Sequence, residues 1–237
     1  MTTNSSIGFV SGMNTSSPAR LLAIYGGTTF LVYIETNGFV KSSPPFLLSV
    51  PILGLSLLTL TTNMAAEPRF KTSASFAVLA FSRYLLTQSS WSYAFMGYLL
   101  VSLANIIYCY SFSSQIRSWS KELTVVSTGY LLLLFYYCFA DLLMSIPSLV
   151  LLLMAAMATS CVNIVGAGSV CQYGHVSDYD AGQASYIRLV GTLVHTAASS
   201  LVVLNLFGER TETLLFASRI LFYVAQGLLF LANERTF

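Results

Sequence analysis

The chain of 237 residues is far more apolar than a soluble protein. It is 55% hydrophobic and 8% charged, with a mean hydropathy of +0.72, whereas about a quarter of the residues of a soluble domain are charged. This composition predicts an integral membrane protein. The net charge of +2 is small and scattered, which argues against a nucleic-acid partner and against a polybasic lipid-binding patch.

The order of apolar segments predicts one transmembrane domain after a short tail. Residues 1–17 are rich in Ser, Thr and Asn and lack the basic start of a signal peptide, so we expect a polar tail. Residues 18–237 should form a single domain. A span needs about 20 mostly apolar residues, and eight windows qualify or nearly do. They are 18–36, 45–63, 72–88, 91–112, 123–139, 141–165, 184–206 and 212–232.

These windows predict an all-α, polytopic membrane helix bundle of about eight transmembrane helices. The connections are short, so consecutive helices should be antiparallel neighbours. The junction at 139–141 leaves open a break within one long helix, which would give seven spans. Pro51 and Pro147 fall inside windows, where a proline kinks a helix.

Basic residues outside the spans predict the orientation, because they favour the cytoplasm. With eight spans, one side carries only Lys41 and Arg210, so both termini should be cytoplasmic. The glycosylation patterns at Asn4 and Asn14 favour the opposite orientation. Endoplasmic reticulum and plasma membrane are equally compatible with the sequence. The other side carries Arg20, Arg69, Lys71, Arg117, Lys121 and Arg235.

The stretch 166–183 should be the longest connection. Its Cys171, His175, Asp178 and Asp180 could bind a metal, but their spacing matches no defined ligand pattern. We therefore favour a solvated, Gly-rich loop and expect neither metal nor cofactor. The cysteines of the chain lack the paired spacing of a metal site or disulfide framework and should behave as small apolar side chains.

Three arginines, Arg83, Arg188 and Arg219, lie within or near the ends of spans and have almost no carboxylate nearby in sequence. Charge at membrane depth is costly, so such residues usually line a bundle interior or an aqueous cavity. Arg219 lies two turns into its window, which favours a cavity-lining role. For Arg83 and Arg188, an anchoring contact with lipid headgroups is an equal alternative.

Polar side chains at helical spacing predict where the interior site lies. If three stripes face inward, they converge on one cavity, since lipid contact would leave them unsatisfied. Taken singly, the hydroxyls fit interhelical hydrogen bonding, and a lone histidine fits a packing role. The stripes are Arg188, Thr192, His195 and Ser199; Arg219, Tyr223 and Gln226; and Tyr98, Ser102, Asn105 and Tyr108.

Three segments resemble the YhhN-like family of membrane proteins, whose characterised members are lysoplasmalogenases. They are Ser218-Arg219-Ile220-Leu221-Phe222-Tyr223-Val224-Ala225-Gln226, Asn105-Ile106-Ile107-Tyr108 and Val50-Pro51-Ile52. The resemblance implies an eight-span fold and hydrolysis of the vinyl ether of a lysophospholipid. It also implies that Arg219 holds the phosphate, because a guanidinium matches phosphate bidentately. Gln226, Tyr108, Ser199, Arg188 and Thr192 complete the expected substrate-binding set.

The family's proton-transfer groups are replaced in this chain. Its helix-three Gly-Asp pair corresponds to Ser82-Arg83, its helix-seven Ser-Asp pair to Ser199-Ser200, and its lysine approximately to Leu48. Asn105 stands in the place of its histidine. An arginine cannot act as a general acid at neutral pH.

The remaining catalytic candidates are therefore His195, Asn105 and Tyr223. We expect a weak or inactive hydrolase that retains binding of an ether lysophospholipid. A transporter or channel for an anionic or amphiphilic substrate and a noncatalytic scaffold are the alternatives.

Overall fold

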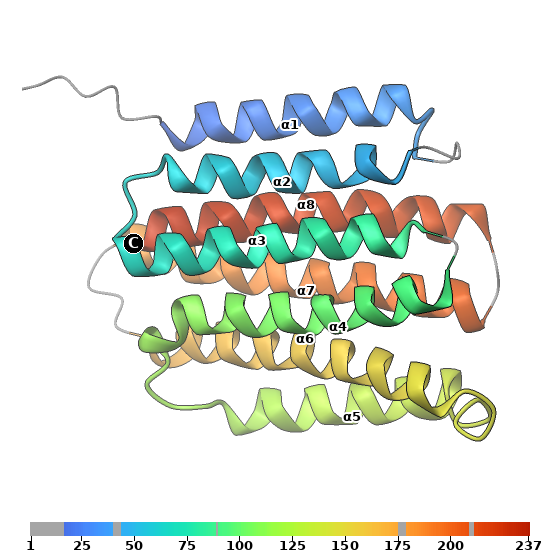
Figure 1. The fold of residues 1–237 in the computed structure, drawn as a ribbon. Coiled ribbons are helices and arrows are strands. Elements are labelled where there is room, and N and C mark those ends of the chain that lie inside the picture. Colours follow the sequence, from blue (N-terminus) through green and yellow to red (C-terminus); the bar gives the residue numbers. More distant parts are fainter. Residues whose placement is uncertain (1–16, 40–43, 89, 175–178, 209–210) are drawn as a thin grey trace, which may run out of the picture.

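The computed structural model shows an all-helical bundle, and it describes residues 17–39, 44–88, 90–174, 179–208 and 211–237. Within them the helices lie side by side and alternate in direction along the chain (Figure 1). The bounds are α1 Pro18–Glu35, α2 Pro45–Leu60, α3 Ala66–Leu86, α4 Trp91–Phe112, α5 Lys121–Cys138, α6 Pro147–Tyr173, α7 Tyr179–Phe207 and α8 Glu212–Thr236, with a 3-10 turn, η1, at Ser113–Gln115.

Four helices, α4, α6, α7 and α8, are long and apolar enough to cross a membrane, and the apolar α2 is shorter. The outer faces carry large exposed apolar side chains. Leu133, Tyr136 and Tyr137 on α5 are 69%, 80% and 73% exposed. Such surfaces are unfavourable in water and ordinary in lipid. The all-α fold expected from composition is therefore confirmed, and the long apolar helices and apolar outer faces support a membrane-embedded protein.

The helix starts follow local sequence rules. Ser17, Ser120 and Thr211 precede α1, α5 and α8, and each side chain accepts a hydrogen bond from the backbone N–H three residues later. This contact satisfies a donor that the helix cannot satisfy itself. Pro51 lies inside α2, as expected.

The predicted bounds of α6 are wrong at both ends. The helix begins at Pro147 and not at residue 141, because proline suits the first helical position and disfavours helix in the residue before it. It continues to Tyr173 and α7 begins at Tyr179, so most of the predicted 166–183 loop is helix. Gly166 and Gly168 are buried in α6, and Leu123 packs directly against Gly168.

Those glycines allow close helix packing, and they do not mark a loop.

His175 and Asp178 lie outside the described residues. Among the described residues, no three His, Cys, Asp or Glu side chains gather as metal ligands, and the four cysteines are free.

Since α5 ends at Cys138 and α6 starts at Pro147 in the opposite direction, the two are separate helices and not one broken helix (Figure 1).

Helix α7 packs most closely on α8, α3 packs on α4, and α4 packs on α6. Helix α5 lies outside against α6, so α4 and α5 are not close neighbours, contrary to the expectation for consecutive helices. The segment 113–120 connects α4 to α5, and the backbone N–H of Ser120 donates to the hydroxyl of Ser169 on α6. This arrangement leaves α3, α4, α6, α7 and α8 surrounding the interior.

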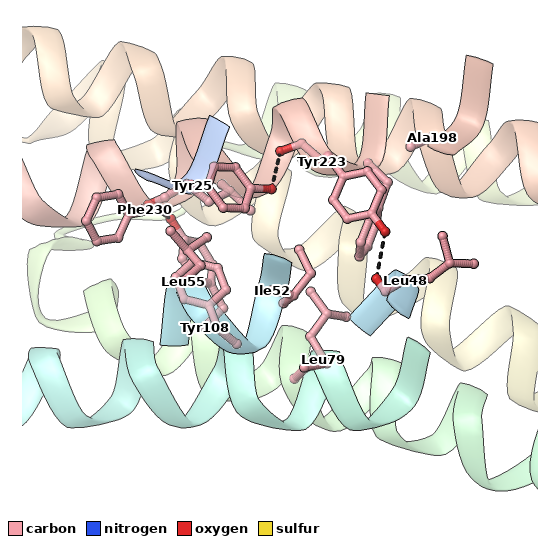
Figure 2. Close-up of a cluster of buried hydrophobic side chains, with 14 of the residues drawn as sticks. Tyr25, Leu48, Ile52, Leu55, Leu79, Tyr108, Ala198, Tyr223 and Phe230 are labelled. Atoms are coloured by element: carbon pink, nitrogen blue, oxygen red, sulfur yellow. Dashed lines mark hydrogen bonds between the residues drawn. The ribbon is translucent and has the colours of Figure 1, made fainter. Parts of the chain in front are cut away.

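A buried core joins the first two helices to α8. Figure 2 shows the Tyr25 hydroxyl donating to the carbonyl of Tyr223 at 2.7 Å, and the Tyr223 hydroxyl donating to the carbonyl of Leu48 at 2.6 Å. Ile52, Leu55 and other buried apolar side chains fill the space around these bonds. The two tyrosines therefore fix α1 and α2 against α8.

Candidate functional site

The interior contains a cavity of about 230 Å³, lined by α3, α4, α6, α7 and α8 together with Leu48 of α2. It extends from His195 to Leu206 along α7, which is about 16 Å of helix. His195 is buried and Leu206 is exposed, so the cavity runs from the middle of the bundle toward one end. Apolar side chains form most of the wall. The main polar lining residues are Arg83, Tyr98, His195, Ser199 and Arg219.

Helix direction brings Arg83 and Arg219 together. Helix α3 runs toward the cavity end of the bundle and carries Arg83 in its last turn, while α8 starts at that end and carries Arg219 two turns in. The guanidinium carbon of Arg83 lies 4.3 Å from the centre of the Phe222 ring, a cation–π contact. Its Nε atom has no hydrogen-bond partner among the described residues.

No described carboxylate balances these two cations. Among the described residues, the salt bridge is that of Lys71 with Glu67, 2.5 Å apart at the opposite end of the bundle. The described lining of the cavity contains no Asp or Glu. Arg83 and Arg219 line the same cavity, and like charges repel each other. The cavity is thus a cationic site with apolar walls, as expected for Arg219 and left open for Arg83.

His195 lies at the inner end of the cavity and is only 5% exposed. Its Nδ1 lies 3.0 Å from Nε2 of Gln226. An amide nitrogen only donates, so Nδ1 is the acceptor and the proton of the neutral ring lies on Nε2. No described group accepts from Nε2. His195 therefore presents an unused N–H donor in the interior.

A second, smaller void of about 10 Å³ lies on the other side of His195. This is roughly the 10–15 Å³ that one water needs. Oδ1 of Asn163, a residue 3% exposed in the wall of this void, also lacks a partner. The other polar residues of its wall are Ser75, Asn105, Tyr108, Ser160, Thr192 and Gln226.

The three predicted stripes do meet inside the bundle, but not around one cavity. Asn105, Tyr108, Thr192 and Gln226 line the small void, whereas Tyr98, Ser199 and Arg219 line the large cavity. Only His195 among the stripe residues borders both. The Asn105 amide also donates to the Ser160 hydroxyl at 2.9 Å, so it ties α4 to α6.

Tyr223 and Ser102 line neither the large cavity nor the small void, because they bond elsewhere. Tyr223 donates to Leu48, as described above, and the hydroxyl of Ser102 donates to the carbonyl of Tyr98 at 3.1 Å. Tyr223 instead lines an apolar groove of about 380 Å³ beside α1. It is a structural link, because its hydroxyl proton is donated to the carbonyl of Leu48, and the hydroxyl lies near Arg83.

Arg188 is the most deeply buried of the three arginines, at 0% exposure. Its guanidinium donates to Oε1 of Gln115 at 2.8 Å, to Oδ1 of Asn233 at 3.2 Å and to the hydroxyl of Thr236 at 2.8 Å. It also packs over the ring of Phe112, 4.8 Å from the centre. Arg188 therefore neither reaches headgroups nor lines the cavity, and it joins α7 to the ends of α4 and α8.

Sequence reasoning missed the partners that complete both sites. Phe222, which holds Arg83, and Asn163 and Ser160, which line the small void, belong to none of the predicted stripes. The alternation of helix direction was a usable signal for pairing Arg83 with Arg219, since it places the end of α3 beside the start of α8.

Comparisons with protein-family models, curated proteins and solved structures find no match to this chain. The geometry of the cavity and the sequence resemblance therefore carry the functional argument.

Proposed function

We propose that this chain is a YhhN-like membrane protein that binds a single-chain ether lysophospholipid without hydrolysing it. One observation carries the proposal: Arg83 and Arg219 share an apolar-walled cavity whose described lining contains no carboxylate. Each guanidinium offers paired N–H donors that match phosphate oxygens. The N–H of His195 adds a donor at the inner end.

The walls fit the apolar part of such a lipid. Leu79, Val202 and Leu206 line the cavity beside the arginines. A volume of about 230 Å³ lies below the usual range for sites that enclose a whole drug-sized ligand, roughly 300–1,000 Å³. The cavity therefore receives the headgroup and the start of the chain, and the remaining chain lies along the lipid-facing surface of the bundle.

Hydrolysis is disfavoured by the groups around His195. Cleavage of a vinyl ether requires protonation of carbon, followed by capture of the cation by water. His195 is the one described lining residue that could give a proton near neutral pH. Its Nδ1 partner is the neutral amide of Gln226 and not a carboxylate that would stabilise the imidazolium. An arginine cannot act as a general acid at neutral pH.

The membrane topology of the helices is also part of the proposal. We infer that all eight helices span the bilayer, with both termini in the cytoplasm, in the endoplasmic reticulum or plasma membrane. Six basic residues lie near the ends where α1, α3 and α5 begin and α8 ends, and such residues favour the cytoplasm. The cavity then extends toward the opposite, noncytoplasmic side, and its ligand enters from that leaflet.

The alternatives lack a supporting contact. A channel or transporter needs a continuous polar path, but beyond the small void the bundle is closed by hydrogen bonds among Tyr108, Asn233 and Arg188. A scaffold would use Arg83 and Arg219 to bond backbone carbonyls. Among the described residues, Arg69 is the arginine that does so, bonding Thr62.

The test is lipid binding and aldehyde release by the purified protein in nanodiscs. We expect a lysoplasmalogen to bind without releasing aldehyde, and Arg219→Gln to weaken binding about tenfold or more, which is about 1.4 kcal/mol. Arg20→Gln, which removes a cation from the opposite end, is the control. Turnover that His195→Ala abolishes, or binding that Arg219→Gln leaves unchanged, would overturn the proposal.

A further inference from the structure

We propose that the cavity selects a phosphate monoester, so that the preferred lipid is a single-chain lysophospholipid ending in a dianionic phosphate and not one with a zwitterionic headgroup. This inference rests on the proposed function, because it uses the same cavity and the same arginines. It goes further by naming the charge of the headgroup.

The first step is charge balance. Arg83 and Arg219 line the same cavity without a described counter-charge. A ligand stabilises this arrangement in proportion to the negative charge that it brings. A phosphate monoester carries about −1.5 to −2 charges at pH 7. A phosphodiester that bears choline or ethanolamine carries one negative and one positive charge, so its net contribution is close to zero.

The second step is the small number of places for an ammonium group. Ammonium groups bind to carboxylates or to the faces of aromatic rings. The described lining has no carboxylate and two aromatic rings. The guanidinium of Arg83 already lies 4.3 Å from the centre of the Phe222 ring, which leaves the ring of Tyr98. An ammonium in this cavity would face two guanidinium groups. Such like-charge contacts discriminate against the wrong ligand.

The third step is the number of donors. Arg83, His195 and Arg219 come from α3, α7 and α8, and they border one cavity from three directions. Nε of Arg83 and Nε2 of His195 are buried and have no described partner. A monoester presents three terminal oxygens, whereas a diester presents two. Three donor groups therefore match the monoester.

The experiment compares two ether lipids with the same 1-O-octadecenyl chain, the ether forms of lysophosphatidic acid and lysophosphatidylcholine, in equilibrium binding to the purified full chain in nanodiscs. We expect the monoester to bind about tenfold more tightly or better. Arg83→Gln should reduce that ratio toward one. Gln115→Ala is the matched control, because its side chain contacts Arg188 outside the cavity, and it should leave the ratio unchanged.

The possible results separate the two proposals. Equal affinity for the two lipids, with binding still dependent on Arg219, would overturn the monoester inference and leave lipid binding intact. No binding of either lipid would overturn both. Glycerol 3-phosphate carries the same group without the chain, and we expect it to bind about tenfold more weakly or worse. Equal binding of glycerol 3-phosphate and the monoester lipid would overturn the lipid assignment and support selection of the phosphate group.

Discussion

His195 and Gln226 join α7 to α8 through a contact of 3.0 Å between Nδ1 and the amide nitrogen. This contact lies between the large cavity and the small void, since His195 lines both. It fixes the ring so that Nε2 is the unused donor. Gln226 acts as a positioning residue for His195, and its neutral amide separates this site from one built for proton transfer.

Replacing Gln226 with leucine should destabilise the protein and weaken ligand binding. The change leaves Nδ1 of His195 buried without a partner, which costs about 1–3 kcal/mol. Thermal unfolding in detergent measures the loss of stability, and lipid titration measures the loss of binding. Val224→Ala, on the exposed face of the same helix, should change neither. Wild-type stability of Gln226→Leu would show that the pair is not formed.

Adjacent serines on α7 offer a matched test of the electrostatics of the cavity. Ser199 lines the cavity, whereas the hydroxyl of Ser200 bonds to Tyr130 of α5. Ser199→Asp should neutralise part of the positive field and weaken binding of an anionic lipid about tenfold or more. Ser200→Asp should leave binding near the wild-type value, because its carboxylate faces α5. Similar effects of both changes on lipid titration would argue against this cavity as the anion site.

The same two serines show how far the sequence could specify the site. Spacing along α7 correctly placed Thr192, His195 and Ser199 inside the bundle, because helical periodicity is a local property. The resemblance aligned the family's second acid with Ser200, but in this chain that residue faces α5. Which inward residues share a cavity depends on helix contacts, and these are not local.

The fold was predictable to a similar degree. Long apolar windows correctly gave the existence and order of the helices. The bounds of α6 required tertiary information, since Gly166 and Gly168 look like loop residues until Leu123 and its neighbours are known to pack against them. The structural role of Arg188 could not be predicted either, because its hydrogen-bond partners Gln115 and Asn233 come from distant segments.

Asn233 should be essential for stability and not for ligand binding. Its amide donates to the hydroxyls of Thr72 at 2.8 Å and Ser111 at 3.0 Å, and its oxygen accepts from Arg188 at 3.2 Å. Asn233→Leu removes a hydrogen bond to a buried charge, so we expect a loss of about 1.5–3 kcal/mol in unfolding free energy. Lipid affinity of the folded fraction should stay near wild type. A selective loss of affinity would place this cluster in the ligand site.

The proposed orientation predicts which end of the bundle can be labelled from outside the cell. Ser118 lies between α4 and α5 at the basic end, and Ser90 precedes α4 at the cavity end; both are exposed. In a cysteine-free background, Ser90→Cys should react with a membrane-impermeant maleimide on intact cells if the protein lies in the plasma membrane. If it lies in the endoplasmic reticulum, Ser90→Cys should react only after sealed microsomes are opened. Ser118→Cys should show the reverse pattern of protection. The expectation follows from the six basic residues near the ends where α1, α3 and α5 begin and α8 ends. Reversed labelling, or a glycan on Asn4 or Asn14, would place the cavity on the cytoplasmic side.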